Sequence, residues 1–172
     1  MNPLKNIFRL IIILLFTAGI SNDTAAQKDS ITKVFIIRHA EKADDGSKDP
    51  PLSGPGKIRA AALAKTLSKT PVHGIYSTAY KRTRETVEVI SAQSGIAIES
   101  YNPMDVEAIQ SLVFSQKGKT LVLVGHSNTV PLILNKLTQS TVYKNLPETE
   151  FDNIWLLLLK GTKLVDLIHL TY

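Results

Sequence analysis

The stretch that decides the fold is residues 31–41, Ile-Thr-Lys-Val-Phe-Ile-Ile-Arg-His-Ala-Glu, where a branched apolar run ends in an arginine and a histidine. The β-branched residues of this run predict a buried strand. Residues 120–128, Thr-Leu-Val-Leu-Val-Gly-His-Ser-Asn, have the same form. Their continuous apolar character is typical of a central strand in a parallel sheet. Two buried strands that each end in a histidine are therefore expected.

Hydrophobic spacing predicts helices around these strands. Apolar or small residues recur at i, i+3, i+4 and i+7, the pattern of one helix face, in segments 60–67, 83–90 and 130–137. Segment 106–113 has apolar residues at i, i+3 and i+7. Further short strands are predicted at residues 74–76 and 96–98, and a hairpin is predicted around Gly161. Strands that alternate with helices imply an α/β fold, a doubly wound three-layer sandwich. We expect a mainly parallel sheet that ends in a C-terminal antiparallel hairpin.

The amino-acid composition excludes several classes of function. The chain has 172 residues, of which 44% are hydrophobic and 20% charged, which suits one globular domain. It has no cysteine, so a disulfide scaffold, a thiolate zinc site and a cysteine nucleophile are excluded. The net charge of +5 weakly favours anionic partners. The lysines are scattered without interleaved aromatic residues, so no nucleic-acid surface is predicted.

Residues 1–26 differ from the rest of the chain. Two basic residues precede an apolar run over residues 10–20, and small residues follow it. The run is shorter than the about 20 residues that span a bilayer as a helix. We interpret the segment as a secretory signal peptide cleaved after Ala26, with an uncleaved anchor as the alternative. The catalytic domain would then be residues 27–172, periplasmic or extracellular, with membrane contact only before cleavage.

The two strand-end histidines, His39 and His126, can meet because the C-terminal ends of parallel strands share one edge of the sheet. Arg38 precedes the first histidine, and Arg82 lies in the first turn of the helix after the strand at 74–76. Arginine offers planar donors that match phosphate oxygens, whereas cationic arginine opposes a metal ion. We therefore predict a phosphate site rather than a metal site. One histidine can attack phosphorus as a neutral imidazole while the other, protonated, stabilises charge.

These residues also carry a family resemblance. Residues 38–41, Arg-His-Ala-Glu, resemble the Arg-His-Gly-Glu signature of the histidine phosphatase superfamily, also called phosphoglycerate mutase-like. Three further motifs that resemble those of the family follow in the expected order, at residues 52–56, 77–86 and 124–127. Ala40 and Ala79 replace the usual glycine and proline, and neither change removes a functional group.

The resemblance implies a phosphatase that needs no metal or organic cofactor and works through a phosphohistidine. It makes His39 the nucleophile and assigns the binding of the phosphoryl group to Arg38, Arg82 and His126. The chain looks like the short branch of the family, which includes phosphohistidine phosphatases. For an exported enzyme we expect a phosphorylated small molecule or envelope component as substrate. The sequence is silent on oligomeric state.

The general acid must be a carboxyl near the phosphate. We expect Asp105, with Glu107 second, while the alternative for Asp105 is a helix cap. Two rival functions stay open, a mutase and a phosphate-binding module without turnover. The binding module becomes the favoured interpretation if neither the Asp105 nor the Glu107 carboxyl reaches the pocket. Asn128 either caps a helix or touches substrate, and His73 and His169 are expected to be structural or exposed.

Overall fold

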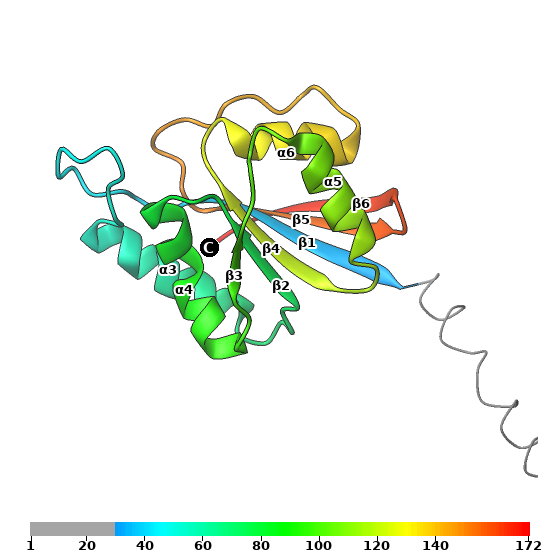
Figure 1. Cartoon of the computed structure of the whole chain (residues 1–172), viewed down its shortest axis with the longest axis horizontal. Helices are drawn as coiled ribbons and strands as arrows, with labels where there is room; N and C mark the ends of the chain where they lie inside the picture. The colour runs from blue at the N-terminus through cyan, green and yellow to red at the C-terminus, as the bar shows by residue number, and fades with distance from the viewer. Residues whose placement is uncertain (1–29) are drawn as a thin grey trace, which may run out of the picture.

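The computed structural model describes residues 30–172 and contains one six-stranded sheet with helices on both faces (Figure 1). The predicted signal segment lies outside the described residues. The elements follow in the order β1 (Ile31–Arg38), α3 (Gly54–Leu67), β2 (Gly74–Ser77), α4 (Lys81–Ser94), β3 (Ile98–Ser100), α5 (Val106–Ser115), β4 (Thr120–Gly125), α6 (Thr129–Thr138), β5 (Asn153–Lys160) and β6 (Lys163–Thr171).

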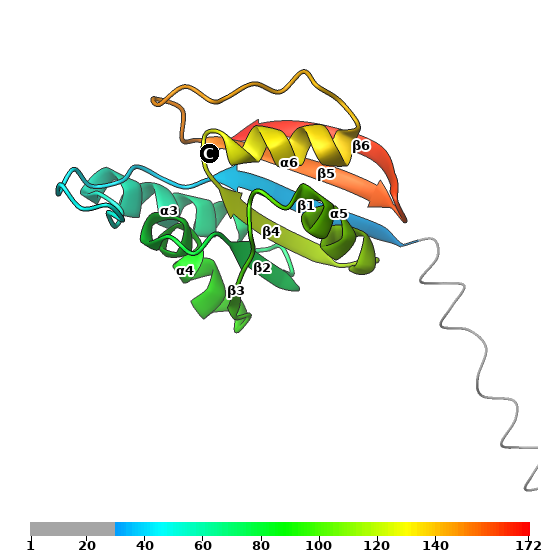
Figure 2. The ribbon, with the colours of Figure 1, turned by 45° about the horizontal axis from the view of Figure 1, so that its top comes forward.

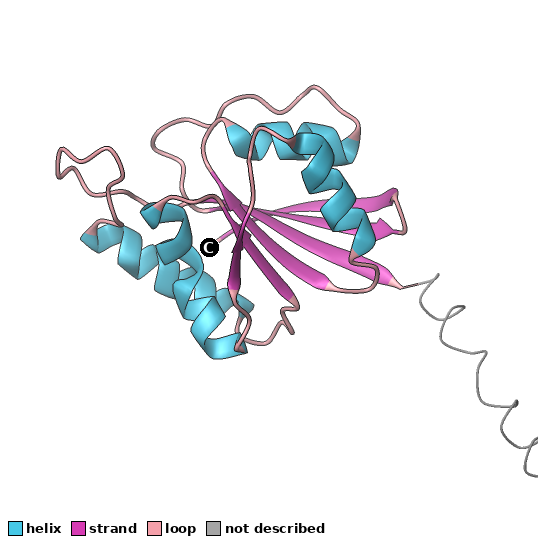
Figure 3. Cartoon of the chain, viewed as in Figure 1, coloured by secondary structure: helices cyan, strands magenta, loops and turns pink. Residues whose placement is uncertain are grey.

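The sheet has the strand order β3-β2-β4-β1-β5-β6. The first four strands of this order run parallel, and β5 and β6 are antiparallel to their neighbours. In the centre, Arg38 of β1 is paired with Gly125 of β4. The two residues that precede the histidine segments are thus held in register. The predicted α/β architecture with a C-terminal antiparallel hairpin is confirmed (Figure 3).

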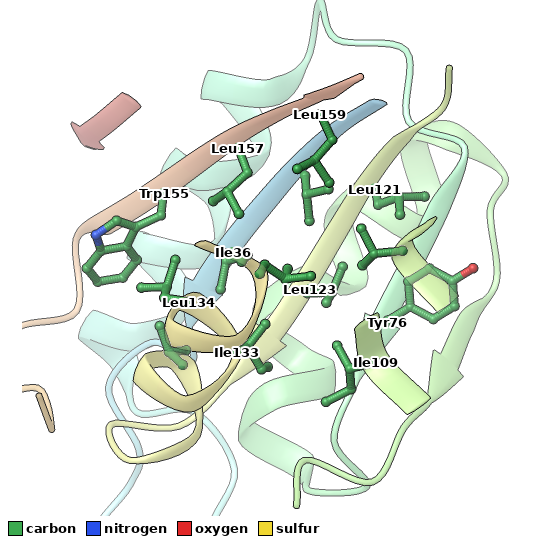
Figure 4. Packing of buried hydrophobic residues seen from close by; sticks show 14 residues of the cluster. Ile36, Tyr76, Ile109, Leu121, Leu123, Ile133, Leu134, Trp155, Leu157 and Leu159 are labelled. Carbon is green, nitrogen blue, oxygen red and sulfur yellow. The ribbon is translucent and has the colours of Figure 1, made fainter. Parts of the chain in front are cut away.

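The helices cover the sheet as two layers, with α5 and α6 on one face and α3 and α4 on the other (Figures 1 and 2). On the α6 side, Ile133 and Leu134 pack against sheet residues that include Ile36 and Leu123 (Figure 4). These side chains are almost fully buried. Burial of an aliphatic side chain of this size contributes about 1.5–3 kcal/mol. The two cores hold the parallel strands, and with them the strand ends, in a fixed arrangement.

One predicted strand is displaced. The strand expected at residues 96–98 is observed as β3, which pairs Ile98 with Ile75 at its first residue. Helix α4 ends at Ser94 and is capped by Gly95, whose φ of 72° is left-handed, and the Ser91 hydroxyl donates to the carbonyl of Ile96. Because this cap takes up the backbone of Ile96, pairing with β2 begins two residues later.

Among residues 30–172, none of the helices has the length and apolar character needed to span a membrane.

Candidate active site

Three parallel strands, β1, β2 and β4, end at the same edge of the sheet, and the predicted functional residues follow these ends. The backbone N–H of His39 donates to the carbonyl of Gly125 at 2.9 Å, so the segment after β1 is bonded directly to the end of β4. His126 is the first residue after β4. The sheet therefore brings the two histidines together, with ring centroids 5.2 Å apart.

A cavity of about 360 Å³ opens at this edge. Its lining includes all four residues predicted to bind phosphate or attack it: Arg38, His39, Arg82 and His126. The remaining lining residues are Lys42, Tyr80, Pro103, Met104, Ser127, Asn128, Thr129, Glu148 and Phe151. The predicted convergence of the four residues at the C-terminal edge of the sheet is thus observed.

The tautomer of His39 is set by its neighbour. Its Nδ1 lies 2.7 Å from the carbonyl oxygen of Ala40, which can only accept a hydrogen bond. Nδ1 therefore carries the proton, and Nε2 has a free lone pair. The same loop is fixed by Thr86, whose hydroxyl accepts from the Ala40 N–H and donates to the carbonyl of Arg82.

Three hydroxyl contacts set the tautomer of His126. The Thr83 hydroxyl donates to the carbonyls of Thr78 and Tyr80, which leaves its oxygen to accept from the Thr78 hydroxyl at 2.9 Å. Thr78 then accepts from His126 Nε2–H, also at 2.9 Å. The lone pair on His126 Nδ1 faces Arg82 Nη2 at 3.4 Å. The second histidine thus accepts a hydrogen bond from the pocket arginine.

Burial makes both imidazoles neutral in the free protein. It lowers the pKa of His39 to about 3, and the positive charges of Arg82 and Arg38 act in the same direction. Burial, followed by Arg82, lowers the pKa of His126 to about 4. A neutral His39 matches the requirement for a nucleophile. The expectation of a protonated partner histidine is not met in the free protein, because burial, followed by the positive charges of the two arginines, favours the neutral imidazole of His126.

Arg38 is nearly inaccessible, with 2% of its surface exposed. Its guanidinium lies 4.2 Å from the centroid of the Phe151 ring. Its Nη1 donates to the carbonyls of Pro147 and Glu150, and its Nη2 donates to Glu148 Oε2 at 2.9 Å. The segment before β5 therefore contacts this arginine with two backbone carbonyls, a carboxylate and an aromatic ring.

Arg82 is held in a similar way by a different segment. Its guanidinium lies 4.6 Å from the centroid of the Tyr80 ring, and its Nη1 is 3.7 Å from Asp49 Oδ1. The Nε atoms of Arg82 and Arg38 are both buried, and neither has a hydrogen-bond partner in the described part of the chain. A buried N–H group that has no acceptor costs free energy. An oxyanion that accepts hydrogen bonds from these two Nε–H groups therefore stabilises the site.

Helix α4 begins at Lys81 and α6 at Thr129, next to this cavity. Helix N-termini carry positive partial charge and free N–H groups, which favour anions. One buried and one half-buried guanidinium group, two imidazoles and two helix starts surround one cavity. This is the arrangement expected for a phosphoryl group.

The comparisons with known proteins agree with this chemistry. The sequence model of the histidine phosphatase superfamily (branch 1) matches residues 34–103, which include the motifs at 38–41, 52–56 and 77–86. Within residues 34–103 the chain is thus similar to the histidine phosphatase superfamily. A search of curated protein sequences finds no match.

Several solved structures share the fold of this chain. The protein histidine phosphatase SixA complexed with tungstate has a TM-score of 0.67 at 17% identity, over 81% of this chain and 96% of SixA. A mycobacterial glucosyl-3-phosphoglycerate phosphatase has a TM-score of 0.66 at 14% identity, over 83% and 98% of the two chains. A phosphoserine phosphatase from Entamoeba histolytica, in complex with 3-phosphoglyceric acid, has 0.63 at 16%, over 79% and 96%. The matched part of this chain thus corresponds to nearly the full length of each of these three chains.

The predicted general acid is not among the residues that line the cavity. Asp105 is the N-cap of α5, and its Oδ1 accepts from the Ala108 N–H at 2.9 Å. Glu107 is exposed and forms an ion pair with Lys136. The placement of Asp105 in the pocket is therefore corrected, because α5 takes up its carboxylate as a cap.

The carboxyl that lines the cavity belongs to Glu148. It lies in the segment between α6 and β5, which has neither a family motif nor a hydrophobic period. One cue was available in the predicted topology. Because β5 is antiparallel to β1, the residues that enter β5 lie at the edge where β1 ends.

The other polar residues singled out from the sequence have clear places. Asn128 occupies the N-cap position of α6 without a side-chain cap bond, and it lines the cavity. Glu41 accepts hydrogen bonds from Arg59 Nε at 2.8 and 2.9 Å. His73 Nδ1 accepts from a β4 backbone N–H, and the ring of His169 is stacked on an indole ring, both outside the cavity lining.

Within residues 30–172, no three side chains of the types that ligate metals are grouped closely enough to hold a metal ion.

Proposed function

We propose that this protein hydrolyses phosphomonoesters through a phosphohistidine formed on His39. The proposal rests on one observation, that the cavity wall combines a neutral histidine with two arginine Nε–H groups that have no acceptor within residues 30–172. His39 lines the cavity as a neutral imidazole with its proton fixed on Nδ1. Arg38 and Arg82, in the same wall, each have a buried Nε without an acceptor. A nucleophile and an oxyanion site therefore meet in one place.

The geometry supports a two-step displacement. His39 Nε2 attacks phosphorus, and the bond from phosphorus to the leaving oxygen breaks. A water molecule then attacks the phosphohistidine, and inorganic phosphate leaves. Negative charge is spread over the phosphoryl oxygens in both transition states, so fixed positive charge and positioning supply most of the catalysis. Arg38 and Arg82 supply that charge without any protonation step.

Acid-labile labelling of the protein tests this proposal. The protein, expressed from its full-length sequence, is mixed with a ³²P-labelled phosphomonoester and quenched in alkali. We expect protein-bound label that is stable in alkali and lost in acid, together with release of phosphate. The His39→Gln variant should show neither. His169→Gln, a histidine outside the cavity, should retain both. Label that persists in His39→Gln would overturn the assignment of the nucleophile.

We further propose that the substrates are phosphorylated small molecules or envelope components that the protein meets after export. The support is the sequence of residues 1–26, with its short apolar run and small residues before position 27. Fractionation of the source cells, followed by intact-mass measurement, tests this. We expect an envelope or extracellular protein whose chain begins at Gln27. A cytoplasmic, full-length protein would contradict it.

One observation favours a second candidate, a phosphate-binding module without turnover. Neither Asp105 nor Glu107 lines the cavity, so the acids expected from the sequence cannot protonate a leaving group there. Such a module would bind phosphate and release none from any ester. A panel of alkyl, sugar and aryl phosphates separates the two candidates, because an enzyme turns over at least the aryl esters, whose leaving groups need little protonation.

A further inference from the structure

Glu148 occupies an unusual position for a carboxylate, at the mouth of an anion site. Its side chain is 75% exposed, yet both of its oxygens are engaged. Oε2 accepts from Arg38 Nη2 at 2.9 Å, and Oε1 accepts from the Ser127 hydroxyl at 3.1 Å. Arg38 and Ser127 line the cavity from two different strand ends. Glu148 is thus fixed beside the site although solvent reaches it.

Arg38 can hold Glu148 and a phosphoryl group together. A guanidinium has five N–H donors. Pro147 and Glu150 take those of Nη1, and Glu148 takes one from Nη2. Nε and the second hydrogen of Nη2 stay available for a phosphoryl oxygen. A phosphoryl group bound there shares Arg38 with the Glu148 carboxyl, so oxygens of the two groups lie within proton-transfer reach.

We propose that Glu148 is the general acid and base of the reaction, an inference that rests on the proposed phosphatase function. In the first step His39 Nε2 forms the bond to phosphorus and the bond to the leaving oxygen breaks. The leaving oxygen keeps the electron pair and takes the proton of the Glu148 carboxyl. In the second step the Glu148 carboxylate takes a proton from water, whose oxygen attacks phosphorus. The electron pair of the P–N bond returns to His39, and Glu148 is protonated again.

Substrate binding supplies the proton that this role needs. Burial is the largest single effect and raises the pKa of the Glu148 carboxyl, but Arg38, the Ser127 hydroxyl and Lys42 of the β1–α3 loop together hold that pKa below the usual value. His39, His126 and Arg82 line the same cavity. A phosphoryl dianion engages these positive charges and repels the carboxylate. Binding therefore raises the pKa of Glu148 and draws one proton from solvent.

The decisive comparison uses two esters and two variants. Glu148→Gln keeps the shape and removes the proton, and Asp105→Asn is the matched control, an exposed carboxyl outside the cavity. For an alkyl phosphate, Glu148→Gln should lower kcat by about 10²–10⁴-fold, the usual contribution of general acid catalysis. For p-nitrophenyl phosphate, whose leaving group is a stable anion, the loss should be less than about tenfold. Asp105→Asn should change neither rate.

Two further measurements separate a catalytic role from a positioning role. Wild-type kcat on the alkyl ester should fall as pH rises through the pKa of Glu148 in the complex, and Glu148→Gln should lack this fall. Calorimetry of phosphate binding in buffers of different ionisation enthalpy should show proton uptake that the variant loses. If Glu148 only orients Arg38, both esters change equally and the pH limb persists, and the inference is overturned.

Failure of this inference and failure of the proposed function give different results. If the wild-type protein releases phosphate and forms labelled His39, but Glu148→Gln shows no dependence on the leaving group, only the inference fails. If the wild-type protein forms no label and hydrolyses no ester, the proposed function fails, and the role of Glu148 fails with it.

Discussion

The cavity has two walls of different origin. The inner wall consists of His39, Arg82 and His126, which follow parallel strands and are held by backbone bonds such as that from His39 to Gly125. The outer wall is the segment 139–152, which has no regular secondary structure and brings Glu148 onto Arg38. The buried strand ends fix the position of the group that attacks phosphorus and of the groups that bind the phosphoryl oxygens. The connecting segment adds the carboxyl that this chemistry also needs.

Apart from the variants of His39 and Glu148, the largest loss of activity is expected in the inner wall. Arg82→Gln removes a charge that lines the cavity and contacts His126, and it should lower kcat/KM by about 10²–10³-fold, as the loss of one oxyanion donor does. Arg84→Gln is the matched control, because Arg84 is an exposed residue on the same helix. Steady-state kinetics on p-nitrophenyl phosphate measure both. Equal rates for the two variants would remove Arg82 from the site.

A pH series extends the test to the buried histidines. The pKa of His39 is about 3 and that of His126 about 4 in the folded protein, whereas an unfolded histidine titrates near pH 6.5. Below about pH 6.5 the unfolded chain thus binds more protons than the folded one. The stability present above this pH should be lost as pH falls towards 4 and then 3.

Urea unfolding at pH 7 and pH 5 measures this loss. His126→Asn removes one of the two groups, so the drop in unfolding free energy between the two pH values should be smaller than in the wild type. A variant with an unchanged drop would show that His126 titrates normally in the folded protein.

Sequence reasoning reached the inner wall and missed the outer one for a physical reason. The ends of parallel strands must share an edge, so a histidine after each of two apolar runs can be placed without coordinates. The position of Glu148 depends on the path of residues 139–152, which no period or cap signal specifies. Asp105 could be placed on α5, but whether its carboxylate caps the helix or enters the cavity depends on packing.

A moderate loss of kcat is expected when the hydroxyl that accepts from His126 is removed. Thr78→Val removes the acceptor for His126 Nε2–H, so the imidazole can adopt the other tautomer. Loss of one hydrogen bond of about 1 kcal/mol corresponds to a kcat lower by about fivefold to tenfold. The pH profile of kcat should move with it. A change in KM alone would indicate that Thr78 affects only the shape of the cavity.

A smaller effect tests the outer wall. Phe151→Leu keeps an apolar contact and removes the ring that lies 4.2 Å from the Arg38 guanidinium. A cation–π interaction at a partly exposed site contributes about 0.5–1 kcal/mol. The affinity for inorganic phosphate, measured by calorimetry, should fall by about two- to fivefold. A loss as large as that of Arg82→Gln would place Phe151 among the groups that hold the arginine rigidly.

The smallest effect on activity is expected at Asp105, and it separates a helix cap from an acid. Asp105→Ala removes the oxygen that accepts from the Ala108 N–H, and it should lower the unfolding free energy by about 1 kcal/mol. Asp105→Asn retains a capping oxygen and should be close to wild type in stability. Because the carboxylate lies outside the cavity, both variants should keep wild-type kcat on alkyl and aryl phosphates. A leaving-group dependence in Asp105→Asn would instead mean that α5 moves its first turn towards the phosphoryl group when substrate binds. The acid would then belong to the helix, and Glu148 would be left as a holder of Arg38.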